Sequence, residues 1–351
     1  MIKTKSMKHP HPTSHIFLFV FLICLSTLLG CQKGKHDNAH PVPEGATLLL
    51  DSGCYPYATR YGDKYYFTCQ TEGESIEIRV VNDLKDIPTA TVHTVWASAN
   101  PRIQHIWAPE MHRIRDNWYI YVEGDDGNTD DHQLYVLECT DDDPLQGQWR
   151  LCGTLLTNRE WNFGLHPTVL QMPDDALYLL WSGWPSRRAE TETQCIYIAR
   201  MSDPCTVSSE RVQLSRPEME WERQWINPDG SRAAYPIYVN ENPQPFLTPD
   251  GRHVCVFYSA SGIWTVYNTL GCLTASSDAN LLDPAAWSKS PEPIGIADTV
   301  FYGTSNICIV PQTDGTHALL FEAKSIQHGE EHRSIYLKPL HFSHEGFPVF
   351  W

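Results

Sequence analysis

The sequence predicts an all-β fold, a single five-bladed β-propeller. A unit made of a strand, an aspartate-containing turn and an aromatic-rich strand recurs five times. Apolar and polar residues alternate within these segments, which are rich in β-branched and aromatic residues, as in antiparallel sheets. No convincing amphipathic helix follows the N-terminal segment. Repeated units of this length and strand content are typical of propeller blades.

The five units are marked by the aspartates of their turns, which are 53, 59, 75 and 64 residues apart. Each unit is followed by a further strand-like segment, namely SIEIRVV, HQLYVLEC, CIYIARMS, TLGCLTAS and RSIYLKPLHF. Three or four strands per unit are enough for one blade. A two-sheet sandwich is the alternative architecture, but it predicts no such regular recurrence. The turn aspartates are Asp63, Asp116, Asp175, Asp250 and Asp314.

Residues 1–31 have the pattern of an export signal. A basic start is followed by the apolar run Ile16–Leu29, whose fourteen residues are fewer than the roughly 20 that span a membrane. The segment Leu28–Cys31 (LLGC) then resembles the bacterial lipobox, in which the cysteine is lipidated and becomes the mature N-terminus. The sequence therefore predicts a lipoprotein signal peptide with Cys31 as the lipidated residue, the alternative being a plain secretory signal cleaved nearby.

The signal sets the predicted domain organisation. Residues 32–45 are polar with Pro and Gly, as in a flexible tether, and residues 46–351 form the propeller. We expect a monomer, lipid-anchored to a bacterial membrane at the outer membrane or cell surface.

The charge balance and the cysteines exclude several classes of function. A net charge of −16 argues against nucleic acid as a partner, because phosphate binding needs a basic face. Nine cysteines follow Cys31 without C-x-x-C spacing, and most lie in apolar strand-like runs. Buried thiols explain them better than a disulfide framework or a zinc site.

The propeller also predicts where a site would lie. The innermost strand of each blade runs along the central axis, so the residues that begin these strands face one another around one mouth. Convergent polar groups in such a concave site are the default binding-site hypothesis, whereas strand-entry residues bonded to nearby backbone are the alternative. Aligning the five units places Tyr55, Ala108–Glu110, His166, Glu241 and Ser305–Asn306 at corresponding positions.

Several motifs in order resemble glycoside hydrolase family 43. HIWAPEMHRIRDNWYIYV (105–122) resembles the second blade of that family, with its W-A-P-E motif. HPTVLQMPDDALYLLWSGW (166–184) resembles its third blade, and VNENPQPF (239–246) resembles the blade that carries its catalytic glutamate. The resemblance covers residues 48–351 and implies a five-bladed propeller that hydrolyses α-L-arabinofuranosides or β-D-xylosides with inversion. It implies an oligosaccharide or polysaccharide as the partner. We expect no cofactor, the alternative being a central structural ion.

The resemblance assigns roles to individual residues. Glu241 stands where the family has its general acid, the group that protonates the leaving oxygen. Tyr55, in Tyr-Pro, stands in place of the aspartate that serves as the general base, and His166, in His-Pro, in place of the aspartate that tunes the acid. The histidine that often helps to hold a central ion is replaced around Ser305.

Three further residues have expected roles in this comparison. Asn306 is retained beside the replaced histidine. Glu322 stands where relatives often carry a histidine, and Glu110 lines the pocket.

Two main functions follow from this pattern. The first is a working glycosidase in which His166, Asp51 or Tyr55 replaces the missing carboxylate opposite Glu241. The second is a sugar-binding propeller that has lost hydrolysis, because removing a general base costs ~10²–10⁴-fold in rate. A third, weaker alternative is lyase chemistry on an acidic glycan. The candidate substrate-binding residues are Tyr55, Trp107, Glu110, Trp184, Trp264 and Asn306.

Overall fold

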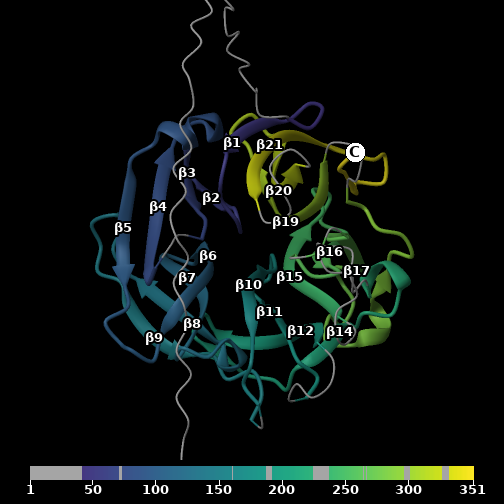
Figure 1. The fold of residues 1–351 in the computed structure, drawn as a ribbon, viewed down its shortest axis with the longest axis horizontal. Coiled ribbons are helices and arrows are strands. Elements are labelled where there is room, and N and C mark those ends of the chain that lie inside the picture. The colour runs from purple at the N-terminus through teal and green to yellow at the C-terminus, as the bar shows by residue number, and fades with distance from the viewer. Residues whose placement is uncertain are drawn as a thin grey trace, which may run out of the picture. The chain divides into compact units, whose positions relative to one another are not determined.

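The computed structural model describes residues 42–70, 73–159, 161–186, 192–223, 237–263, 265, 267–295, 301–325 and 332–351. These residues form an all-β, five-bladed β-propeller, as predicted. Figure 1 shows the blades following one another around the axis, from β2 to β21. The predicted signal peptide, Cys31 and most of the tether lie outside the described residues, within which no helix is long and apolar enough to cross a membrane.

Blades 1 and 2 are four-stranded antiparallel sheets whose strands follow one another from the axis outward (Figure 1). Blade 1 contains β2 (Tyr57–Tyr61), β3 (Lys64–Thr68), β4 (Ser75–Val81) and β5 (Val92–Ala97). Blade 2 contains β6 (Gln104–Ile114), β7 (Asn117–Asp125), β8 (Gln133–Cys139) and β9 (Arg150–Thr154).

Blades 3 and 4 belong to one nine-stranded sheet, because β12 and β15 pair in parallel over three residues, with Gln194 opposite Val239. Blade 3 contains β10 (Leu165–Gln171), β11 (Leu177–Gly183), β12 (Glu192–Asp203), β13 (Thr206–Val207) and β14 (Val212–Ser215). Blade 4 contains β15 (Ile237–Leu247), β16 (His253–Ala260), β17 (Thr269–Ser276) and β18 (Ser288–Lys289).

Blade 5 combines strands from both ends of the propeller. The N-terminal strand β1 (Thr47–Leu50) pairs antiparallel with β21, with Leu48 opposite Tyr336. This pairing covers an edge of the C-terminal blade that would otherwise be unpaired. The other strands of blade 5 are β19 (Phe301–Pro311), β20 (His317–Ser325), β21 (Arg333–Phe342) and β22 (Pro348–Val349).

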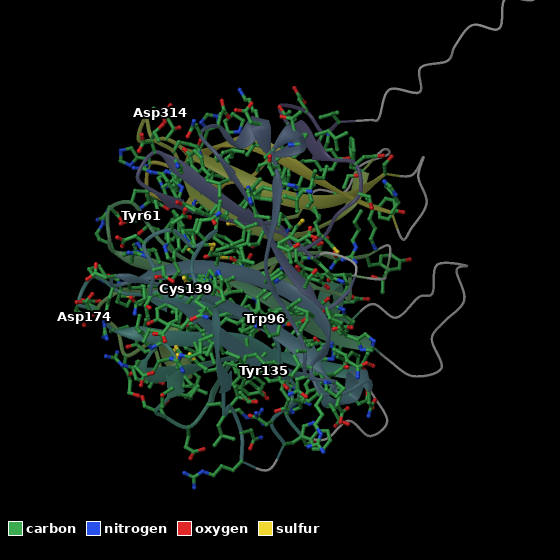
Figure 2. All side chains as sticks on the ribbon, turned by 90° about the vertical axis from the view of Figure 1, so that its left-hand side faces the viewer. Tyr61, Trp96, Tyr135, Cys139, Asp174 and Asp314 are labelled. Atoms are coloured by element: carbon green, nitrogen blue, oxygen red, sulfur yellow. The ribbon has the colours of Figure 1, made fainter. Side chains whose placement is uncertain are left out.

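Short 3₁₀ segments and hairpin turns connect the strands. The predicted turn aspartates all lie in the connection between the first and second strand of a blade. Figure 2 shows Asp174 and Asp314, from two such turns, at the same face of the propeller, so the inner strands begin toward the opposite face. The 3₁₀ segments are η1 (Leu84–Thr89), η2 (Thr129–Asp131), η3 (Glu220–Glu222) and η4 (Pro284–Ala286).

Five hydrophobic clusters lie between neighbouring blades, one at each interface. Alternation along β3 explains how one strand serves two of them, since successive side chains point to opposite faces of a sheet. Tyr65 and Phe67 pack toward blade 5, whereas Tyr66 packs toward blade 2. Figure 2 shows Tyr135 and Cys139, which belong to the cluster between blades 1 and 2. All nine cysteines of the described residues are free thiols.

Candidate active site

The inner strands of the five blades share a backbone feature, which lies just before β2, at the second residue of β10 and near the middle of β6, β15 and β19. One residue there has a positive φ, between 44° and 54°, a conformation that residues with a Cβ rarely adopt. In blades 2 to 5 the pairing with the second strand is irregular at this point. Such strain costs ~1–3 kcal/mol at each residue and persists only where the surroundings impose it. The five residues are Tyr55, Ala108, His166, Asn242 and Asn306.

This feature corrects the predicted alignment by one residue in blade 4. The sequence alignment matches Glu241 with Tyr55 and His166, but the positive φ falls on Asn242. Glu241 therefore precedes the strained residue, at the place that Trp107 takes in blade 2.

Two of the strained residues are held by serines of the preceding blade. The backbone N–H of Asn242 donates to Ser182 Oγ at 2.9 Å, and the N–H of Asn306 donates to Ser259 Oγ at 3.1 Å. Both serines are on second strands and are fully buried. The second strand of one blade therefore fixes the start of the next blade.

Two other strained residues are held in the same way by glutamates. The N–H of His166 donates to Glu123 Oε2, and the N–H of Tyr55 donates to Glu322 Oε1. Both glutamates are on second strands and have no exposed surface. A carboxylate has a second oxygen that a serine lacks, so each of these side chains brings an additional charged contact to the axis.

His166 lies between two glutamates. Its Nδ1 lies 3.6 Å from Glu123 Oε1, and its Nε2 lies 3.6 Å from Glu241 Oε2. The ring of Tyr55 covers the imidazole, with 5.0 Å between the ring centroids. His166 is only 2% exposed.

The charges around His166 outweigh its burial. Burial by itself lowers the pKa of a histidine, since it disfavours the charged form, but Glu123 and Glu241 favour the imidazolium. The net effect raises the pKa of His166 above its ordinary value.

Glu241 is fixed at both carboxylate oxygens. Oε1 accepts a hydrogen bond from the backbone N–H of Ile263 at 3.1 Å, whereas Oε2 faces His166. The residue lies in β15 and is 2% exposed. These contacts give its carboxylate a defined orientation.

Tyr55 occupies a buried, charged environment. Burial raises the pKa of its phenol well above the ordinary value, so the hydroxyl is neutral at physiological pH. The guanidinium of Arg333 lies over its ring at 5.6 Å, and Arg333 Nη1 lies 3.4 Å from Glu322 Oε2. A buried neutral phenol is poorly suited to the nucleophilic role considered for Tyr55.

Asn306 connects blades 4 and 5. Its Oδ1 accepts from Asn242 Nδ2 at 2.6 Å and from Ser259 Oγ at 3.1 Å, and its Nδ2 donates to Glu322 Oε1 at 2.9 Å. These bonds involve both the oxygen and the nitrogen of the side-chain amide. The predicted substrate-binding residue is 1% exposed in this conformation.

Glu110 belongs to a separate buried network further along the inner strands. Gln244 Nε2 donates to its Oε1, and His112 Nε2 lies 3.2 Å from its Oε2. The other ring nitrogen of His112 lies 3.2 Å from the hydroxyl of Tyr57. Glu110 thus contacts two side chains of inner strands, Gln244 and His112.

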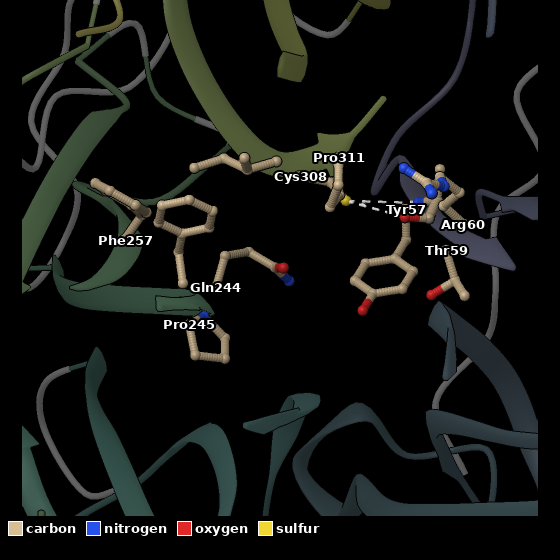
Figure 3. A pocket seen from close by; sticks show the side chains of 11 residues that line it. Tyr57, Thr59, Arg60, Gln244, Pro245, Phe257, Cys308 and Pro311 are labelled. Carbon is tan, nitrogen blue, oxygen red and sulfur yellow. Dashed lines mark hydrogen bonds between the residues drawn. The ribbon is translucent and has the colours of Figure 1, made fainter. Parts of the chain in front are cut away.

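A cavity of about 240 Å³ lies next to this network. Tyr57, Gln244 and Cys308 contribute to its lining (Figure 3), and each follows the strained residue of its blade by two positions. The cavity therefore lies along the inner strands, past the residues that surround His166.

The remaining predicted residues have varied surroundings. The ring of Trp107 lies 4.3 Å from that of His132. Trp184 is 4% exposed and packs on Phe163 at 3.8 Å, so it offers little surface to a sugar in this conformation. Trp264 lies outside the described residues.

Asp51 lies in the bend before blade 1. Its carboxylate is 67% exposed and lies 3.5 Å from His332 Nε2. His332 immediately precedes β21, and this contact involves neither His166 nor Glu241.

The sequence patterns point to no role for Glu123, and to none for Glu322 beyond a departure from the family pattern. A signal for both was present, because each is a glutamate that directly follows an apolar run of its strand, in YIYVEG and LLFEAK. Fully buried glutamates are rare unless they are paired.

The comparison with known proteins decides the family. A model of glycosyl hydrolases family 43 matches residues 53–348. The chain belongs to this family. The family 43 chain is 31% identical, over 85% of its length and 87% of the other protein, to an extracellular exo-α-(1→5)-L-arabinofuranosidase of Streptomyces chartreusis.

Two further comparisons place this family 43 chain among similar proteins. It is 29% identical, over 91% of its length, to an α-L-arabinofuranosidase B of Pyricularia oryzae, of which it spans 63%. A crystal structure of an α-L-arabinofuranosidase from Lactobacillus brevis superposes with a TM-score of 0.76 at 27% identity, covering 86% of this chain and 95% of that one.

Proposed function

We propose that this protein is an exported, lipid-anchored glycoside hydrolase that releases arabinofuranosyl groups from polysaccharide side chains, with Glu241 as the general acid. The names of the similar proteins favour α-L-arabinofuranosides over β-D-xylosides as substrates. The protein of Streptomyces chartreusis is described as extracellular, which supports export.

The observation that carries the proposal is the contact between Glu241 and His166. A general acid must hold a proton at working pH, and in this family a nearby carboxylate usually serves that purpose. Here the partner is a histidine with a raised pKa, 3.6 Å away. The pair can hold one proton at neutral pH, either as a carboxylic acid with an imidazole or as a carboxylate with an imidazolium.

His166 belongs to the acid side of the reaction. Inverting hydrolysis needs the acid and the base about 6.5–9.5 Å apart, with room for the sugar and a water between them. His166 lies 3.6 Å from Glu241, which is too close for His166 to serve as the base. The geometry thus favours His166 as a partner of Glu241 over His166 as the group that activates water.

A second candidate function is sugar binding without hydrolysis. It is favoured by Tyr55, which is buried and neutral at the place where the family carries its base. Glycan recognition needs no base.

One experiment separates the two functions. The purified protein is assayed with aryl α-L-arabinofuranoside, aryl β-D-xyloside and arabinan, and binding of arabino-oligosaccharides is measured by calorimetry. Turnover that Glu241→Gln lowers by ~10²-fold or more supports hydrolysis, with Glu292→Gln as an exposed control. Binding without turnover supports the second function.

A further inference from the structure

Glu123 has both carboxylate oxygens directed at one residue. Oε2 accepts the backbone N–H of His166, and Oε1 lies 3.6 Å from its Nδ1. Glu123 lies in β7 of blade 2, whereas His166 is the second residue of β10 in blade 3. The contact therefore crosses a blade interface.

The glutamate and the histidine stabilise each other's charged forms. A carboxylate without exposed surface is costly unless it is paired with a charge or well hydrogen-bonded. The imidazolium of His166 is the charge that faces Glu123. Beyond it, the opposite ring nitrogen faces Glu241, so the three side chains form a row with the histidine in the middle.

Two carboxylates contact the imidazole of His166, a third carboxylate lies at longer range, and the neutral ring of Tyr55 covers it. Glu123 approaches from blade 2, Glu241 from blade 4, and Tyr55 from blade 1. Glu110 adds a weaker negative field. All three acidic groups favour the protonated ring.

We propose that Glu123 is a positioning residue, which holds His166 as an imidazolium turned toward Glu241, so that the Glu241–His166 pair supplies the proton to the leaving oxygen. This inference rests on the proposed function. Typical relatives carry a negatively charged aspartate at the position of His166. In this protein Glu123, which belongs to the preceding blade, supplies the negative charge.

The proton balance of the step is simple. As the glycosidic C–O bond breaks, its electron pair goes to the leaving oxygen, which takes a proton from the carboxyl of Glu241. This is the single proton of the pair, which Nε2 of His166 passes to Glu241 beforehand, so the step leaves Glu241 as a carboxylate and His166 as a neutral imidazole. Water adds its hydroxyl to the anomeric carbon and releases its other proton to solvent, from which His166 is protonated again.

The test is a measurement of the protonation of His166 that needs no turnover. Histidine ring ¹H–¹⁵N correlation spectra of the ¹⁵N-labelled protein are followed from pH 5 to 9, and His166→Gln identifies the signal. In the wild type we expect the imidazolium to persist above the ordinary pKa of about 6.5. Glu123→Gln keeps an acceptor for the backbone N–H but removes the charge, and we expect it to lower the pKa of His166 by about one unit or more.

Two variants make the result specific. Glu322→Gln is the matched control, because Glu322 holds the N–H of Tyr55 in the same way without contacting His166, so the pKa of His166 should stay unchanged. Glu123→Asp keeps the negative charge, so the pKa of His166 should stay raised for the most part. This variant also keeps the inference testable if Glu123→Gln folds poorly.

Activity provides a second, independent readout. If the enzyme turns over, Glu123→Gln should move the alkaline limit of kcat/KM to lower pH by the same amount. Neutral His166 at pH 7 in the wild type, or an unchanged pKa in Glu123→Gln, would overturn the inference. A third outcome is a protein without turnover in which the pKa of His166 is raised and depends on Glu123. This outcome would reject the proposed hydrolysis instead, because Glu123, His166 and Glu241 would then be arranged as described without catalysing the reaction.

Discussion

The imidazole Nε2 of His166 lies 3.6 Å from the carboxylate Oε2 of Glu241, with both side chains almost fully buried. The two residues are on different blades, and each is held by a further contact. Glu123 holds His166, and the backbone N–H of Ile263 holds Glu241. This pair is the centre of the candidate active site, and the predictions below concern it and its support.

Activity should fall as the pH rises through the pKa of His166. The active form of the pair carries one proton, and this proton is lost when the histidine becomes neutral. Because the pKa of His166 is raised, the fall should lie at a higher pH than the ordinary value of about 6.5. The pH profile of kcat/KM measures it, and a profile that is flat across this range contradicts the assignment.

Stability should follow the same titration. A histidine whose folded pKa is raised above its unfolded value stabilises the fold fully below the unfolded pKa and loses this contribution as the pH rises through the folded pKa. The free energy of unfolding should therefore decrease above about pH 6.5. Urea denaturation at several pH values tests this, and in His166→Gln this part of the pH dependence should disappear.

Tyr55→Asp should raise hydrolysis if the missing base limits the enzyme. A carboxylate at this position restores the residue type that the family uses, and general-base catalysis contributes ~10²–10⁴-fold in rate. Aspartate also adopts a positive φ, here 54°, more readily than tyrosine does. Initial rates on aryl α-L-arabinofuranoside measure the effect.

Tyr55→Asn is the matched control for that substitution. It has nearly the shape of aspartate and tolerates the same backbone, but it cannot accept a proton. An equal rise in both variants would attribute the effect to removal of the phenol ring rather than to a base.

Glu322→Gln should destabilise the propeller by about 1–3 kcal/mol. The amide can still accept the N–H of Tyr55, but Arg333 loses its counter-charge at 3.4 Å. The free energy of unfolding from urea denaturation tests this, with the exposed Glu292→Gln as control. A change below about 0.5 kcal/mol, the usual size for surface substitutions, would show that the ion pair adds little.

Leu49→Ala should destabilise the chain by about 2–5 kcal/mol, the usual cost of truncating a buried leucine. Leu49 is in β1 and packs in the cluster between blades 1 and 5, where the two ends of the propeller meet. Val92→Ala, at a 42% exposed position of β5, is the comparison that should change little. Similar losses in both variants would argue against a special role for this interface.

Much of the fold could be predicted from local patterns. The alternation in KYYFT, for example, is enough to place Tyr65 and Phe67 on one face of a strand and Tyr66 on the other. Asp63 and its four counterparts mark the hairpin turns because turn residues act within a few positions of the chain.

The candidate site could be predicted only in part. The start of each inner strand is identifiable from the sequence, and the structure brings Tyr55, His166, Glu241 and Asn306 together there. The predicted alignment is wrong by one residue in blade 4, where the positive φ falls on Asn242 and not on Glu241. A local backbone distortion of this kind leaves no clear trace in residue periodicity.

The sequence by itself determined the strands, their turns and the number of blades, because alternation and turn chemistry are local properties. Only the tertiary structure decided which charges meet at the axis. Glu123 is 43 residues from His166, and Glu322 is 267 residues from Tyr55. Nevertheless, Glu123 accepts the backbone N–H of His166, and Glu322 accepts that of Tyr55. The ring of blades brings the second strand of one blade against the inner strand of the next, and no spacing along the chain encodes that contact.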